Sequence, residues 1–215
     1  MKYIIDSANL QEIQAALEMG AYGITANPSM YRKEQQTLIP FLTACHTMEP
    51  AFLSGEAMGN TLAEMEEEVR RIREISADIV IKLNFSENAL KLCKRLHKRG
   101  IRTAVTLIFT TAQAVAAISA GADYLFPFIG RSEAYGLDGL RLIHDIQSMI
   151  SLHGYPVSVV AASVKNLYQL EAAAAAGVSY AAIPYSLYQM SLKHPLTEQG
   201  ALNFERDWSA LSVGN

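Results

Sequence analysis

The first apolar run of the chain, Lys2-Tyr3-Ile4-Ile5, leads directly into Asp6-Ser7-Ala8-Asn9. Parallel strands that alternate with helices build either an open doubly wound sheet or a closed (β/α)8 barrel. The doubly wound sheet usually carries a glycine-rich phosphate loop after its first strand. No G-x-G-x-x-G sequence occurs there or elsewhere in the chain, so this stretch favours the barrel.

The rest of the sequence repeats this alternation of short apolar runs and helix-length segments. Strands are predicted at residues 2–6, 23–26, 51–57, 78–83, 102–108, 124–129, 157–162 and 180–184. Helices are predicted at 10–19, 33–47, 61–75, 86–98, 112–119, 137–152 and 166–176. This order predicts an α/β protein, a (β/α)8 TIM barrel that forms a single domain over residues 1–215.

A surplus helical segment follows the last predicted strand. Residues 186–191 and then about 196–211 have helical patterns, with Phe204 and Trp208 four residues apart. A closed barrel leaves such a helix no place in its ring. We therefore expect this extra C-terminal helix to cover the barrel or to reach a neighbouring subunit.

Composition and charge exclude several classes of protein. The chain is 50% hydrophobic and 18% charged, which excludes a disordered chain. Its net charge of −3 gives no basic surface of the kind that binds nucleic acid. No run of 18 apolar residues exists, so no contact with a membrane is expected. The first apolar run is too short for a signal peptide. With only Cys45 and Cys93, we expect reduced thiols in a cytoplasmic protein.

Polar side chains stand where the predicted strands end, and in a barrel these ends surround the active site. The candidates, in chain order, are Asp6, Thr25, Asn27, Glu56, Lys82, Thr106, Arg131, Ser163 and Lys165.

Lys82 is the most informative of these residues, because it lies in the apolar strand Asp78-Ile79-Val80-Ile81-Lys82-Leu83. An ammonium group inside a barrel is costly unless it is paired. Burial favours the uncharged amine of a lysine, a nucleophile that can form a Schiff base with a carbonyl. A structural ion pair with Asp6 or Glu56 explains the residue equally well.

The other candidates suit the same chemistry. Asp6 and Glu56 can move protons during Schiff-base formation and carbon–carbon cleavage, while the Thr106 hydroxyl positions a water; each carboxylate could instead cap a helix or form a salt bridge. A phosphate clamp is predicted from Arg131, Ser163 and Lys165, with surface cations as the alternative. The five histidines show no metal-ligand spacing with Cys or Glu, so we expect no metal.

Six stretches at the predicted strand ends match one family. They are Ile5-Asp6-Ser7-Ala8-Asn9, Gly23-Ile24-Thr25-Ala26-Asn27-Pro28-Ser29, Asp78-Ile79-Val80-Ile81-Lys82, Val105-Thr106-Leu107-Ile108-Phe109, Pro127-Phe128-Ile129-Gly130-Arg131 and Ala161-Ala162-Ser163. From Met1 to about Leu211 the chain resembles the small transaldolases and fructose-6-phosphate aldolases, which are class I aldolases on a (β/α)8 barrel.

The resemblance implies a role for each candidate. Lys82 matches the Schiff-base lysine, Asp6 the acid/base that acts on the substrate C4 hydroxyl, and Glu56 with Thr106 the pair that holds the catalytic water. The positions that match substrate-binding residues of the family are Thr25, Asn27, Phe128, Arg131, Ser163 and Lys165, the last three of them for the phosphate.

Two positions separate the subgroups, and four others depart from the family pattern. At the positions of Glu56 and Phe128, transaldolases look like this chain, with Glu and Phe. The fructose-6-phosphate aldolases have Gln and Tyr at these positions. A phenyl ring cannot help water to release bound dihydroxyacetone, so transfer to a second aldehyde is favoured. The departures are Ala26, Asn84, Ala104 and Phe126; Ala104 loses a polar contact, and Phe126 narrows the pocket if its ring points inward.

The resemblance therefore predicts a transaldolase that moves a dihydroxyacetone unit from a ketose phosphate to an aldose phosphate through a lysine Schiff base, without a cofactor. The alternatives are an aldolase that splits fructose 6-phosphate into dihydroxyacetone and glyceraldehyde 3-phosphate, and a non-catalytic barrel that binds sugar phosphates. Short members of the family form pentameric rings, often paired into decamers, with the C-terminal helix on a neighbour. A homo-oligomer of this kind is the expected assembly.

Overall fold

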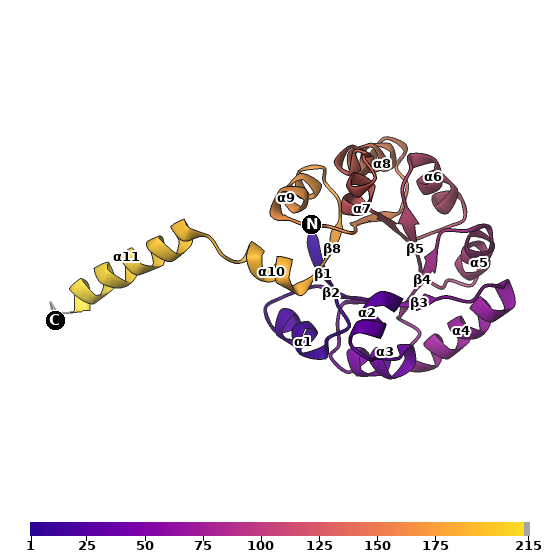
Figure 1. Ribbon diagram of the computed structural model, residues 1–215, viewed down its shortest axis with the longest axis horizontal. Helices are drawn as coiled ribbons and strands as arrows, with labels where there is room; N and C mark the ends of the chain where they lie inside the picture. The colour runs from indigo at the N-terminus through magenta and orange to yellow at the C-terminus, as the bar shows by residue number, and fades with distance from the viewer. Residues whose placement is uncertain (213–215) are drawn as a thin grey trace.

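The computed structural model describes residues 1–212. Each of its parallel strands pairs with the next, and the eighth pairs with the first, so the sheet closes into a barrel (Figure 1). The strands are β1 (Lys2–Asp6), β2 (Gly23–Thr25), β3 (Phe52–Ala57), β4 (Val80–Asn84), β5 (Thr103–Ile108), β6 (Tyr124–Pro127), β7 (Ser158–Ala161) and β8 (Tyr180–Ile183). The predicted (β/α)8 barrel is confirmed; residues 213–215 of the predicted domain lie outside the described residues.

Helices surround the barrel in a ring (Figure 1). They are α1 (Leu10–Glu18), α2 (Pro28–Lys33), α3 (Leu38–His46), α4 (Leu62–Ile75), α5 (Glu87–His97), α6 (Thr111–Ser119), α7 (Ile129–Ala134), α8 (Gly139–His153), α9 (Leu167–Ala175) and α10 (Tyr185–Ser191), followed outside the ring by α11 (Pro195–Ser212). Cys45 and Cys93 are free thiols buried beneath this ring.

Two connections differ from the prediction. The single helix predicted at 33–47 is wrong: α2 begins at Pro28 and α3 at Leu38, and Gln35 between them has a φ of 52°. Asn27 starts α2 by accepting hydrogen bonds from two backbone N–H groups, and Pro28 suits the first helical position. The strand predicted at 124–129 is also too long, since β6 ends at Pro127 and α7 follows it. The other elements lie within two residues of their predicted bounds.

The last helix, α11, extends away from the barrel (Figure 1). Large apolar side chains are exposed along it, at Leu196, Leu202, Phe204, Trp208 and Leu211. Of the two expected placements of this extra helix, covering the barrel is excluded, and contact with a neighbouring subunit stays a prediction. Within residues 1–212, no helix combines the length and the apolar character that crossing a membrane requires.

Inward-facing side chains of the strands form layers across the barrel. The registers pair Glu56 with Lys82, Lys82 with Ala104, and Thr106 with Phe126. Because barrel strands are tilted, inward-facing residues of alternate strands come to the same height. Followed around the barrel, the registers place one layer at Thr25, Lys82, Phe126 and Ala182. The next layer toward the carboxyl ends holds Asp6, Glu56, Thr106 and Ala162.

Gly23 is the position on β2 where the barrel has no room for a side chain. A Cβ atom there would lie 2.3 Å from the backbone oxygen of Phe52, its register partner on β3. We expect Gly23→Ala to lower the free energy of unfolding by about 1–3 kcal/mol or more through overpacking, measured by urea denaturation. Gly200→Ala, which has open space around it on α11, is the matched control. An unchanged unfolding midpoint for Gly23→Ala would contradict this account of the β2–β3 packing.

Candidate active site

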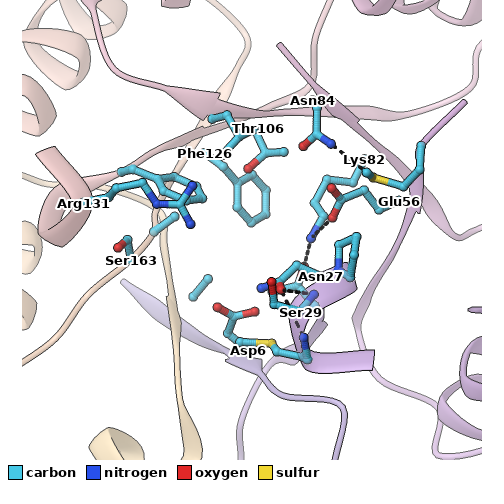
Figure 2. A pocket seen from close by; sticks show the side chains of 18 of the residues that line it. Asp6, Asn27, Ser29, Glu56, Lys82, Asn84, Thr106, Phe126, Arg131 and Ser163 are labelled. Carbon is cyan, nitrogen blue, oxygen red and sulfur yellow. Dashed lines mark hydrogen bonds and ion pairs between the residues drawn. The ribbon is translucent and has the colours of Figure 1, made fainter. Parts of the chain in front are cut away.

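A cavity of about 300 Å³ opens at the carboxyl ends of the strands. All ten residues that the sequence singled out line it, although they come from seven strand ends or the loops and helices after them (Figure 2). These residues are Asp6, Thr25, Asn27, Glu56, Lys82, Thr106, Phe128, Arg131, Ser163 and Lys165. The structure therefore brings the whole predicted set together.

Lys82 lies deep in this cavity, on β4, with its side chain 5% exposed. Its Nζ atom is 3.0 Å from Oε2 of Glu56, whose side chain is 4% exposed. Nζ also donates hydrogen bonds to Oγ1 of Thr25, at 3.1 Å, and to the backbone oxygen of Ala26. A buried ammonium needs such partners. The ion pair with Glu56 that the sequence allowed is present, and it stands beside an open cavity rather than in a closed core.

Glu56 and Thr106 belong to the layer above Lys82 and flank it on β3 and β5. Apart from its ion pair with Lys82, no group of the described chain hydrogen-bonds to Oε2 of Glu56. A buried polar atom without a partner commonly marks the place of a water or a ligand. The strand carrying Thr106 bulges at Leu107, which has a φ of 60°, so the ladder to β6 shifts immediately after Thr106.

Asp6 ends β1 on the opposite wall of the cavity from Lys82 and Thr106 (Figure 2). Desolvation by the surrounding protein raises the pKa of Asp6 from its usual 3.8 to about 6, against the opposing effect of the cations Lys82 and Lys165. The Glu56 charge also raises it. A carboxyl group with a pKa near 6 can both accept and donate a proton near neutral pH.

Asn27 lies beside Asp6, at the start of α2. Its Oδ1 accepts hydrogen bonds from the backbone N–H groups of Ser29 and Met30. These bonds hold the side-chain amide at the cavity wall, where its N–H₂ group can donate to a hydroxyl. The sequence Asn-Pro-Ser that fixes this arrangement is also the signal for α2.

Cationic groups gather at the mouth of the cavity. Arg131 on α7 places its guanidinium 4.8 Å from the ring centre of Phe128. The N–H of Gly130 donates to the backbone oxygen of Ser163, at 2.9 Å, and Gly130 also packs against Lys165. A Cβ on Gly130 would lie 2.5 Å from that oxygen, so the close approach that brings Arg131 toward Ser163 and Lys165 requires a glycine. Arg and Lys together suit an anion such as phosphate.

Other lining residues were not among the predicted site residues. Ser29, Met30 and Met58 reach the cavity from the segments after β2 and β3. Met58 receives a hydrogen bond from the side chain of Asn84 on its Sδ atom, at 3.1 Å. These three residues follow strand ends closely in the sequence, and this position could have indicated that they line the cavity. The ring of Phe126 also lines the cavity, so the departure at this position does narrow the pocket.

Comparisons with known proteins show the family of this chain. A family model described as transaldolase/fructose-6-phosphate aldolase matches residues 3–212. A probable transaldolase of Brachyspira hyodysenteriae is 38% identical over 98% of this chain and 99% of its own length. Probable transaldolases of Clostridium botulinum and Thermodesulfovibrio yellowstonii are each 37% identical, over 99% and 98% of this chain and 100% and 99% of their own lengths. This chain belongs to the transaldolase/fructose-6-phosphate aldolase family.

Proposed function

We propose that the chain is a transaldolase that moves a dihydroxyacetone unit between sugar phosphates through a Schiff base on Lys82. The observation that carries the proposal is the position of Lys82 Nζ, buried beside an open cavity and 3.0 Å from a carboxylate. A group that needs a proton acceptor to become a nucleophile has one within reach. The names of the relatives support transfer as the reaction.

The reaction begins when Lys82 loses a proton and attacks the ketone carbon of the donor. The carbinolamine then loses water to form the Schiff base, with Glu56 and Thr106 holding the water. Asp6 accepts the proton of the C4 hydroxyl while the C3–C4 bond breaks, which releases an aldose phosphate. The enamine left on Lys82 attacks the aldehyde carbon of the acceptor, and hydrolysis of the new Schiff base returns the amine.

The cavity has cationic groups at its mouth and the amine of Lys82 deeper inside, and this arrangement orients a bound sugar phosphate. Arg131, Ser163 and Lys165 at the mouth hold the phosphate, and Asn27 donates to a hydroxyl of the chain between phosphate and ketone. These groups lie around the rim, whereas Lys82 lies deeper. A ketose phosphate can therefore place its carbonyl against the amine while its phosphate stays at the entrance.

Aldolase-type cleavage of fructose 6-phosphate is the second candidate, because the family description names both activities. Phe128 favours transfer, since it presents a ring without a hydroxyl to the cavity. The two activities are separated by measuring free dihydroxyacetone with and without an acceptor aldehyde. A transaldolase needs the acceptor for turnover.

The first test traps the Schiff base. Borohydride reduction in the presence of fructose 6-phosphate is expected to leave a stable adduct on Lys82, located by peptide mass spectrometry. Lys82→Ala and Lys82→Arg should abolish both adduct and turnover; the arginine variant keeps a positive charge beside Glu56, so loss of a buried charge cannot explain its effect. Lys91→Ala, an exposed change on α5, is the control. No adduct with any ketose phosphate would favour a non-catalytic binding protein.

The second test uses the pH dependence of cleavage. Because the raised pKa of Asp6 is about 6, the carboxylate that accepts the C4 proton is lost as the pH falls through 6. We expect kcat/KM for cleavage to decrease below that pH in the native protein. Asp6→Asn should lower kcat by about 10²–10⁴-fold, and the decrease of kcat/KM below pH 6 should disappear. A wild-type profile that stays flat between pH 5 and 7 would exclude Asp6 from this role.

We infer that the protein assembles as a homo-oligomer, a pentamer or decamer, through α11. This helix carries exposed Leu196, Leu202 and Phe204 and extends from the barrel. Such apolar side chains favour burial against another copy.

Deleting residues 197–215 is expected to yield a smaller species in sedimentation velocity, because the apolar face of α11 is removed. Far-ultraviolet circular dichroism should confirm that the barrel remains folded. Glu205→Gln, an exposed polar change on the same helix, should leave the assembly intact. A full-length chain that sediments as a monomer would refute the inference.

A further inference from the structure

The side-chain amide of Gln169 joins the two segments that carry the cations of the cavity mouth. Gln169 lies in the first turn of α9, and the residue is only 3% exposed. Its Oε1 accepts a hydrogen bond from the backbone N–H of Lys165, at 2.6 Å. Its Nε2 donates to Oε2 of Glu133 on α7, also at 2.6 Å. One buried side chain therefore connects the segment of Lys165 to the helix that carries Arg131.

Capping of α9 accounts for only part of this arrangement. Asn166 is the N-cap residue, and its side chain accepts a hydrogen bond from the backbone N–H of Gln169, at 2.9 Å. A glutamine at this third helical position commonly bonds back to the backbone at the start of the helix, as Oε1 does here. Capping requires nothing of Nε2, yet this atom donates to Glu133 on another helix. The amide can make both bonds because it carries an acceptor oxygen and a donor N–H₂ group.

The backbone joins the same two segments one turn earlier. The N–H of Gly130 donates to the oxygen of Ser163, at 2.9 Å. Arg131 follows at the next position on α7, and the amide of Gln169 holds this helix again at Glu133. Figure 2 shows Arg131 and Ser163 on the same wall of the cavity. The backbone of Arg131 thus lies between two points of attachment, which limit its movement relative to Ser163.

The turn that carries Ser163 needs support from its surroundings. Ser163 has a φ of 56°, in the left-handed region that is unfavourable for residues with a side chain. Such a conformation persists only where the surrounding structure holds it. Gln169 does so by binding the N–H of Lys165, two residues later, and Gly130 does so by binding the oxygen of Ser163.

The bond from Nε2 also keeps the carboxylate of Glu133 engaged. Glu133 lies two residues after Arg131 on α7. A carboxylate that is free to pair with a guanidinium competes with phosphate for it, because both anions bind the same forked donors. Loss of the amide would therefore weaken phosphate binding in two ways. The spacing of the cations would relax, and a carboxylate would be released beside one of them.

We propose that Gln169 is a positioning residue that holds the three phosphate-binding residues at a fixed spacing. This inference rests on the proposed function, in which Arg131, Ser163 and Lys165 bind the phosphate of the substrate. Gln169 lies behind the cavity wall and not among the residues that line it, so it acts through these three residues. It thereby sets how strongly the protein prefers phosphorylated to unphosphorylated sugars.

Two ketoses that differ in one phosphate measure this preference. Borohydride trapping on Lys82 over a range of concentrations gives a half-saturation concentration for fructose 6-phosphate and for fructose. Gln169→Glu keeps the acceptor for Lys165 but sets a second carboxylate against Glu133. We expect half-saturation of this variant by fructose 6-phosphate to require about tenfold more sugar or greater. The value for fructose and the rate at saturation should stay native, because only binding of the phosphate is changed.

Inorganic phosphate tests the same three residues without any reaction. Isothermal titration calorimetry of the native full-length protein gives a dissociation constant for phosphate. In Gln169→Glu this constant should rise by the factor seen with fructose 6-phosphate. Gln169→Met removes both hydrogen bonds without adding a charge, and it takes the place of Gln169→Glu if circular dichroism shows that the latter does not fold.

Two further variants separate positioning from a general effect of the added charge. Gln14→Glu on α1 is the matched control, because Gln14 is exposed and donates to the carboxylate of Glu18, at 3.0 Å. It should leave every value unchanged. Combining Gln169→Glu with Glu133→Gln again sets a donor against an acceptor. We expect this exchange to recover phosphate affinity at least about fivefold relative to Gln169→Glu alone.

The outcomes distinguish this inference from the function on which it rests. Weaker binding of phosphate and fructose 6-phosphate, with fructose unchanged, supports the positioning role. If the native protein forms the adduct on Lys82 and the changes at Gln169 affect both sugars equally or neither, the inference is overturned and the proposed function stands. If the native protein forms no adduct, the proposed function fails, and an unchanged dissociation constant for phosphate in Gln169→Glu would then overturn the inference as well.

Discussion

The structure depends on an ammonium and a carboxylate that lie side by side inside the barrel. Lys82 and Glu56 are register partners on β4 and β3, and both side chains are about 95% buried. Either charge alone would be costly at this depth, so each requires the other. A slip of one residue between these strands would turn one of the two charges into the surrounding helices. The pair that the proposed chemistry uses is therefore also the pair that fixes the register on which the cavity depends.

Two adjacent layers of inward-facing side chains hold different kinds of groups. The layer of Lys82 also contains Thr25 and two apolar side chains, Phe126 and Ala182. The next layer contains Asp6, Glu56, Thr106 and Ala162. Because the layers alternate between odd and even strands, Asp6, Glu56 and Thr106 lie on strands next to those that carry the layer of Lys82. A barrel closed from eight short strands achieves this with side chains that are far apart in sequence.

Much of the fold and most of the site could be predicted from the sequence, because both depend on where strands end. Apolar runs and helical periods locate the strands, and parallel strands bring their carboxyl ends to one edge. For this reason Asp6, Lys82 and Ser163 could be placed in one cavity. The helices α2 and α7 were missed, since six residues carry little periodicity and only the cap at Asn27 marks the first of them. The direction of α11 could not be predicted either, because nothing in its own amphipathic pattern states what it packs against.

The charges around Asp6 connect its pKa with the cationic mouth of the cavity. Desolvation raises the pKa of Asp6 to about 6, and the positive charges of Lys82 and Lys165 oppose this shift. Lys165 is also one of the groups proposed to bind phosphate. A phosphate dianion bound there offsets the charge of Lys165, and its own charge also raises the pKa of Asp6. If the proposed function holds, Asp6 becomes a stronger base once the sugar phosphate is bound, and phosphate binding at the mouth is then coupled to proton transfer near Lys82.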